Sequence, residues 1–139
     1  MTIQDFIGKH GISLTARPAD SNPNLADPLP GGHHWLCTLG RPSVRPFTVF
    51  FSQGSARTAP PTADDVLDCL AADSSGVEGL SFDEWARGFG YDPDSRKAER
   101  IYKVCQRQAK RLRHFLGEKA YLVLLNEVER LWVCWGNGS

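Results

Sequence analysis

The stretch GYDPDSRKAER at residues 90–100 contains two aspartates one residue apart, as at the start of an EF-hand calcium loop. Such a loop needs a ligand at its fifth position, glycine at its sixth and glutamate at its twelfth. Counted from Asp92, those three positions hold cations: Arg96, Lys97 and Lys103. Asp92 as N-cap, Pro93 as first helical residue and Asp94 behind it suit a helix start instead. We therefore predict a capped helix and no metal site here.

His33, His34 and Cys37 are the one clustered set of soft metal ligands in the sequence. On a strand, the odd spacing of His34 and Cys37 directs their side chains to opposite faces of the sheet. A structural zinc site needs about four ligands, and the next cysteine or histidine is Cys69. Cys69 and Cys105 lie on apolar helical stripes, which favours burial over nucleophilic chemistry. We predict no catalytic residue, no cofactor and no metal.

The four cysteines also bear on the compartment. Cys37, Cys69, Cys105 and Cys134 lie far apart in the sequence and form no Cys-x-x-Cys pair. The first residues, MTIQDFIGKHG, lack the apolar run of a signal peptide, and no stretch approaches the roughly 18 apolar residues of a membrane span. We expect a cytoplasmic protein with reduced thiols and no membrane contact.

Charge is strongly segregated although the chain is neutral overall. Residues 62–94 hold nine acids and one base, and residues 95–114 hold eight bases and one acid. On a helix, five of these bases form a ridge off the apolar stripe: Arg100, Lys103, Arg107, Lys110 and Arg111. One interpretation is that acidic helices pack beside the ridge and neutralise it. The other is that the ridge binds an anionic partner, either nucleic acid or an acidic protein face.

The elements that must position these residues follow from periodicity and caps. We predict helices at 3–9, 62–73, 81–90, 93–116 and 118–135, strands at 12–17, 34–39 and 47–52, and a loop at 18–32. Thr2, Thr62 and Ser81 are the expected N-caps of three of these helices. The segment between the second and third strands, GRPSVRP, is the expected hairpin connection.

This order predicts the α+β class, with an N-terminal helix, a three-stranded antiparallel sheet and then four helices packed on one face. At 139 residues the chain is expected to form a single domain, which needs neither disulfide nor metal to fold. Residues 1–60 are its mainly β half, 61–135 its helical half and 136–139 a flexible tail.

Several segments together resemble a family of small proteins encoded by phages, prophages and related mobile elements. They are MTIQDFIGKHGI, DSNPN, FTVFFSQGS, PTADDVLDCLAAD and SFDEWARGFGYDPDSRKAERIYKVCQRQAKRLRHFLG, and they run over most of residues 1–125. The resemblance implies a genomic neighbourhood more than a mechanism. Small phage proteins without catalytic motifs often act by stoichiometric binding, for example as anti-CRISPR inhibitors of bacterial defence.

We therefore expect a non-enzymatic binding protein that antagonises a host target, with a CRISPR effector as the first candidate. Acids of the segment 62–94 would imitate DNA phosphates towards a basic channel, or the ridge would meet an acidic face. The candidate acids are Asp64, Asp65, Asp68, Asp73, Asp83 and Glu84. The alternative is a nucleic-acid-binding regulator that uses the basic helix at 95–114.

Overall fold

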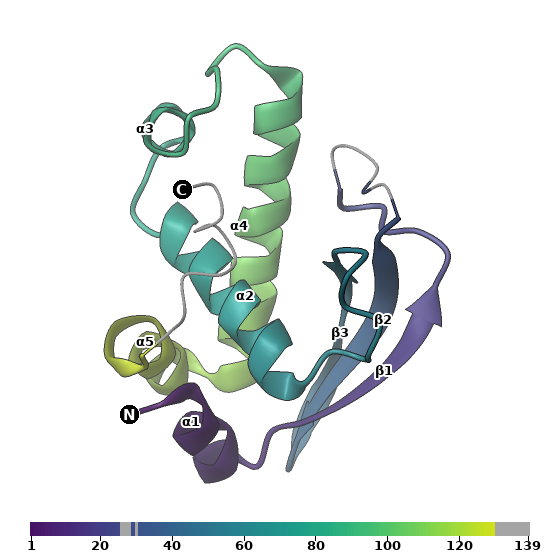
Figure 1. The fold of residues 1–139 in the computed structure, drawn as a ribbon. Helices are drawn as coiled ribbons and strands as arrows, with labels where there is room; N and C mark the ends of the chain where they lie inside the picture. Colours follow the sequence, from purple (N-terminus) through teal and green to yellow (C-terminus); the bar gives the residue numbers. More distant parts are fainter. Residues whose placement is uncertain (26–28, 30, 130–139) are drawn as a thin grey trace.

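The secondary structure follows the predicted order of one helix, three strands and four helices in a computed structural model that describes residues 1–25, 29 and 31–129 (Figure 1). The elements are α1 (Ile3–His10), β1 (Ser13–Ala19), β2 (His33–Arg41), β3 (Val44–Gln53), α2 (Ala63–Val77), α3 (Phe82–Gly88), α4 (Arg96–Leu116) and α5 (Glu118–Glu127). The three strands form an antiparallel sheet in the order β1-β2-β3. The α+β class is thus confirmed.

Three helices begin at the caps that the sequence predicts. The side chains of Thr2, Thr62 and Ser81 each accept a hydrogen bond from the backbone amide three residues on, and the carboxylate of that third residue accepts a bond from the cap's own amide. These reciprocal bonds satisfy amide groups that the first helical turn leaves without partners.

The start of α4 differs from the prediction. The helix begins at Arg96 rather than residue 93, and its N-cap is Ser95, whose hydroxyl accepts from the amide of Ala98. Asp92 instead accepts a bond from the amide of Asp94 at 3.0 Å, which forms a turn before the helix. Aspartate favours both arrangements, because its side chain bonds to its own downstream backbone in turns as well as in caps.

The strands extend beyond their predicted ends. β2 and β3 continue to Arg41 and Val44, so the turn between them is Pro42 and Ser43, with Ser43 in a left-handed conformation at φ 63°. Arg41 Nη1 donates to the carbonyl oxygens of Phe115 and Leu116, at 3.1 and 2.7 Å. This residue therefore ties the hairpin to the C-terminal end of α4, where carbonyl groups lack helical partners.

One hydrophobic core lies between the inner face of the sheet and the helices α1, α2, α4 and α5. Alternate residues of β2 and β3 enter it, as the period of a half-covered strand requires. Its largest fully buried side chains are Tyr121, Phe6, Leu39, Leu67, Leu112 and Leu124.

A second, smaller core holds α3, which packs on α2 and α4 rather than against the sheet (Figure 1). Trp85 is buried there between aromatic rings, with Tyr91 stacked at 5.1 Å and Tyr102 at 5.2 Å between centroids. α3 therefore belongs to a core separate from the one that involves the sheet.

The last helix ends earlier than predicted. α5 stops at Glu127 with Val128 extended, and Glu129 donates its amide to the carbonyl of Met1 at 2.9 Å. The remainder of the predicted helix up to residue 135, the predicted tail at 136–139 and Cys134 lie outside the described residues. Within the part of the chain that is described, no helix is long and apolar enough to cross a membrane.

Candidate functional site

The basic ridge predicted from the sequence lies on α4 as one exposed stripe. Its five members, Arg100, Lys103, Arg107, Lys110 and Arg111, are all exposed. The opposite face of the helix carries the buried residues Ala98, Tyr102, Cys105, Ala109 and Leu112. At 1.5 Å per residue, this 21-residue helix is about 30 Å long.

Neutral oxygen atoms hold three of the ridge arginines in place. Arg100 Nη2 donates to the carbonyl of Leu25 at 2.7 Å, and Arg107 Nη2 to Asn24 Oδ1 at 3.2 Å. Arg111 Nη2 donates to the carbonyl of Thr48 at 2.6 Å. These bonds fix the guanidinium groups to the loop before β2 and to the edge of β3. They orient the positive charges without cancelling them.

Ion pairs with acidic residues neutralise little of the positive charge of the ridge. Lys103 pairs with Glu99 one turn earlier, at 2.9 Å, and both side chains are exposed. Among the described residues, none of the five ridge bases forms an ion pair with an acid of residues 62–94. From that acidic segment, Glu78 pairs with Arg113 at 3.3 Å, off the ridge. The interpretation in which acidic helices neutralise the ridge by contact does not hold for the described contacts.

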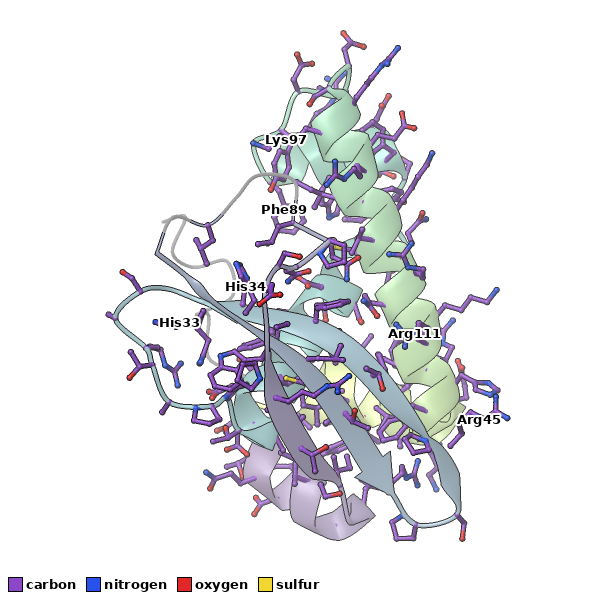
Figure 2. All side chains as sticks on the ribbon, turned by 90° about the vertical axis from the view of Figure 1, so that its right-hand side faces the viewer. His33, His34, Arg45, Phe89, Lys97 and Arg111 are labelled. Carbon is purple, nitrogen blue, oxygen red and sulfur yellow. The ribbon has the colours of Figure 1, made fainter. Side chains whose placement is uncertain are left out.

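A basic groove of about 550 Å³ continues the ridge at the C-terminal end of α4. Its charged walls are Arg45 on β3 and Lys110, Arg111, Arg113 and His114 on α4. The Phe47 ring lies beneath Arg111, whose guanidinium carbon is 4.5 Å from the ring centroid. Figure 2 shows Arg45 beside the lower part of α4, on the same side of the molecule as Arg111.

Three basic side chains of this groove are available to a partner. Within residues 1–25, 29 and 31–129, no hydrogen bond or ion pair engages the side chains of Arg45, Lys110 or His114. Arg45 belongs to the hairpin connection predicted from the sequence, and its place beside α4 could not be predicted, because strand–helix packing decides it. We call the ridge and this groove together the basic face.

The six candidate acids do not form one surface. Asp64, Asp65 and Asp68 line a cleft of about 700 Å³ near Arg57, where Asp65 pairs with Arg57 at 3.3 Å and Asp68 is only 6% exposed. Asp83 and Glu84 lie on α3, and Glu84 accepts the amide of Ser81 in a capping box.

Asp73 stands apart from the other five acids. It is half-buried and lines a cavity between α2, α4 and the edge of β3. Burial raises the pKa of this carboxyl from 3.8 to about 6. The sequence contained a signal for this position of Asp73. Val66, Leu70, Asp73 and Val77 follow the spacing of one face of a helix, and the apolar members of that set are buried.

Cys37, Cys105 and His34 take the positions predicted for core and strand, whereas Cys69, which was predicted to be buried, is only partly buried. Cys37 is fully buried, whereas His34 is partly exposed and its Nδ1 lies 2.7 Å from Ser52 Oγ of β3. Burial raises the pKa of the Cys37 thiol to about 11 and that of Cys105 to about 12, with Asp73 adding to the latter. Both thiols are therefore protonated at neutral pH, unlike a cysteine nucleophile.

The basic face is thus the feature whose geometry offers a binding surface. Family models, curated proteins and solved structures were each compared with the chain, and none of them matches it.

Proposed function

We propose that this protein acts by stoichiometric binding and antagonises a bacterial defence system such as a CRISPR–Cas effector, with the basic face as its docking surface. The observation that carries the proposal is the positive charge of Arg100, Arg107 and Arg111, which neutral oxygen atoms orient on one exposed stripe of α4. In this proposal the protein works in the cytoplasm of a bacterial host, as a product of a phage or another mobile element.

The physical fit favours a partner that contains nucleic acid. A CRISPR effector holds a guide–target heteroduplex and a displaced single strand, so phosphates are present at its working surfaces. A stripe of cations along a helix attracts such phosphates at long range and gains further from counterion release on contact. Lys103 and Lys110 are suited to this role because neither side chain anchors the fold.

A functional assay tests this proposal with a matched pair of variants. Lys103→Glu/Lys110→Glu reverses two exposed ridge charges, and Arg87→Glu/Lys119→Glu makes the same charge change at exposed residues on α3 and α5. We expect wild type and the second variant to restore plasmid survival in cells whose CRISPR system targets that plasmid. The ridge variant should lose the effect. Unchanged interference on expression of the wild type contradicts the proposal.

The groove favours a second candidate function, a nucleic-acid-binding regulator. Five basic side chains line it, and such a concentration of basic groups suits the phosphates of nucleic acid. Gel-shift titration of a duplex and of a single strand, each at two salt concentrations, examines this function. We expect affinity to fall steeply with salt and with reversal of Arg107. Binding without salt dependence contradicts it.

A further inference from the structure

A cavity of about 300 Å³ lies between α2, α4, β3 and the loop before β2, on the flank of α4 next to the ridge. Its walls come from the loop before β2, from β3, from α2 and from α4. Most of the lining is apolar: Leu25, Val49, Phe50, Phe51, Val66, Leu70, Ile101 and Val104. The volume is at the lower end of the range for small-molecule pockets, which are typically about 300 to 1,000 Å³.

Asp73 is the charged residue in this mostly apolar lining. Within the described part of the chain, its carboxyl forms no hydrogen bond and no ion pair. Such a group is costly to keep in an apolar wall, because burial removes water without supplying a partner. Its raised pKa is the direct sign of that cost, although at neutral pH the group is still mainly ionised.

The polar neighbours of Asp73 do not supply a counter-charge. Cys69 and Cys105 line the cavity, and the Cys105 thiol stays protonated at neutral pH. Gln108 is buried and its Oε1 accepts from Arg111, which points to the basic face. Within the residues described, no group of three or more His, Cys, Asp and Glu side chains is placed to hold a metal ion. One carboxylate and no second ligand suits an organic cation better than a metal.

The walls of the cavity are held in place from outside. Asn24 and Leu25 are fixed by Arg107 and Arg100 of the ridge, and Asn22 Nδ2 donates to Ser52 Oγ at 2.9 Å. A pocket whose walls are anchored in this way is already formed before a ligand arrives, which lowers the entropic cost of binding.

We propose that this cavity binds a small, mostly apolar organic amine, whose ammonium group pairs with the Asp73 carboxylate while its carbon skeleton occupies the space between Val49, Leu70 and Val104. The pairing supplies the counter-charge that the protein itself does not provide, and the apolar walls exclude ligands with a second charge. The proposed docking is tested through Lys103 and Lys110, and neither of these side chains lines the cavity.

The probe is phenethylammonium, and its matched neutral control is 2-phenylethanol. Titration of methyl-labelled protein, followed by NMR at neutral pH, is expected to shift the methyl resonances of Val49, Leu70 and Val104 with phenethylammonium. Binding of the alcohol should be at least about tenfold weaker, because it cannot form the charged pair. Equal affinity for the two compounds, or no shift of these three methyl groups, overturns the proposal.

Two variants separate the site from general effects. Asp73→Asn removes the charge and is expected to weaken phenethylammonium binding by about tenfold or more while leaving the fold intact. Val104→Phe fills the cavity and is expected to abolish binding of both compounds. Asp83→Asn, an exposed acid on α3, is the control and should bind as the wild type does. Undiminished binding to either Asp73→Asn or Val104→Phe contradicts the assignment.

Discussion

Asp73 is a carboxyl group in a mostly apolar setting. The groups around it on α4, β3 and the adjoining loop are Cys105, Gln108, Ser52 and Asn24, and none of these is charged at neutral pH. Burial alone therefore raises its pKa from 3.8 to about 6. The folded protein binds this proton more tightly than the unfolded chain does.

The sign of the resulting pH dependence is fixed by this shift. The stabilising contribution of protonated Asp73 is fully present below about pH 3.8 and is lost as the pH rises through about 6. Asp73→Asn is expected to increase the free energy of unfolding at pH 7 by roughly 1–3 kcal/mol, with a much smaller gain at pH 4. Urea unfolding at both pH values measures this difference. The control Asp20→Asn, at an exposed position, should show no gain in stability at either pH. A gain of equal size at both pH values for Asp73→Asn would contradict the assignment of the effect to ionisation of Asp73.

Arg41 is a second residue with a defined task. Its guanidinium donates to two carbonyl groups at the end of α4, whereas Arg45, four residues later in the same hairpin, makes no such bond to described residues. Arg41→Ala should lower the free energy of unfolding by about 1–3 kcal/mol, as loss of charge-assisted bonds does. Arg45→Ala should stay within about 0.5 kcal/mol of the wild type. Chemical denaturation of both variants measures this, and equal losses would show that the capping bonds contribute nothing.

At the scale of elements, the sequence predicts most of the fold because short-range signals determine it. The caps at Thr2, Thr62 and Ser81 and the alternation in β2 and β3 are local properties, and the helices and strands they predict are present. The predicted start of α4 was wrong. Asp92 and Ser95 both carry side chains that form N-caps, and the local sequence pattern alone does not show which of them caps the helix.

The corrected start of α4 has a measurable consequence. Ser95→Ala removes the bond to the amide of Ala98 and should cost about 1 kcal/mol of stability. Asp92→Ala removes a turn bond outside the helix and should cost less, a few tenths of a kcal/mol. Thermal unfolding followed by circular dichroism compares the stabilities of the two variants. A larger loss of stability for Asp92→Ala would indicate that Asp92 is the N-cap, as the sequence pattern predicted.

The candidate site was predictable only in part, because it depends on long-range packing. The ridge on α4 followed from the charge run and the helical period, and the structure places its members on one exposed stripe. The groove and the cavity could not be predicted from the sequence. Arg45, Asn24 and Leu25 come close to α4 only when the sheet and its loop have folded. No local pattern encodes such contacts.

At the scale of the whole molecule, charge is divided between separate regions. Acids gather around the cleft at the start of α2 and on α3, and the bases of α4 lie on the basic face. Because the net charge is zero, the protein has no general attraction to anions. The separation of charge instead orients the molecule in the electric field of a charged partner. An anionic partner would accordingly contact the basic face.

The most direct test of docking through the basic face is an affinity pull-down with mass spectrometry from phage-infected host cells. The bait proteins are the wild type, Lys103→Glu/Lys110→Glu and the control Arg87→Glu/Lys119→Glu. We predict that the wild type and the control recover a nucleic-acid-containing defence complex, and that the ridge variant recovers at most about a tenth as much. Recovery of that complex at equal yield by the ridge variant, or of no defence component by the wild type, would contradict the account.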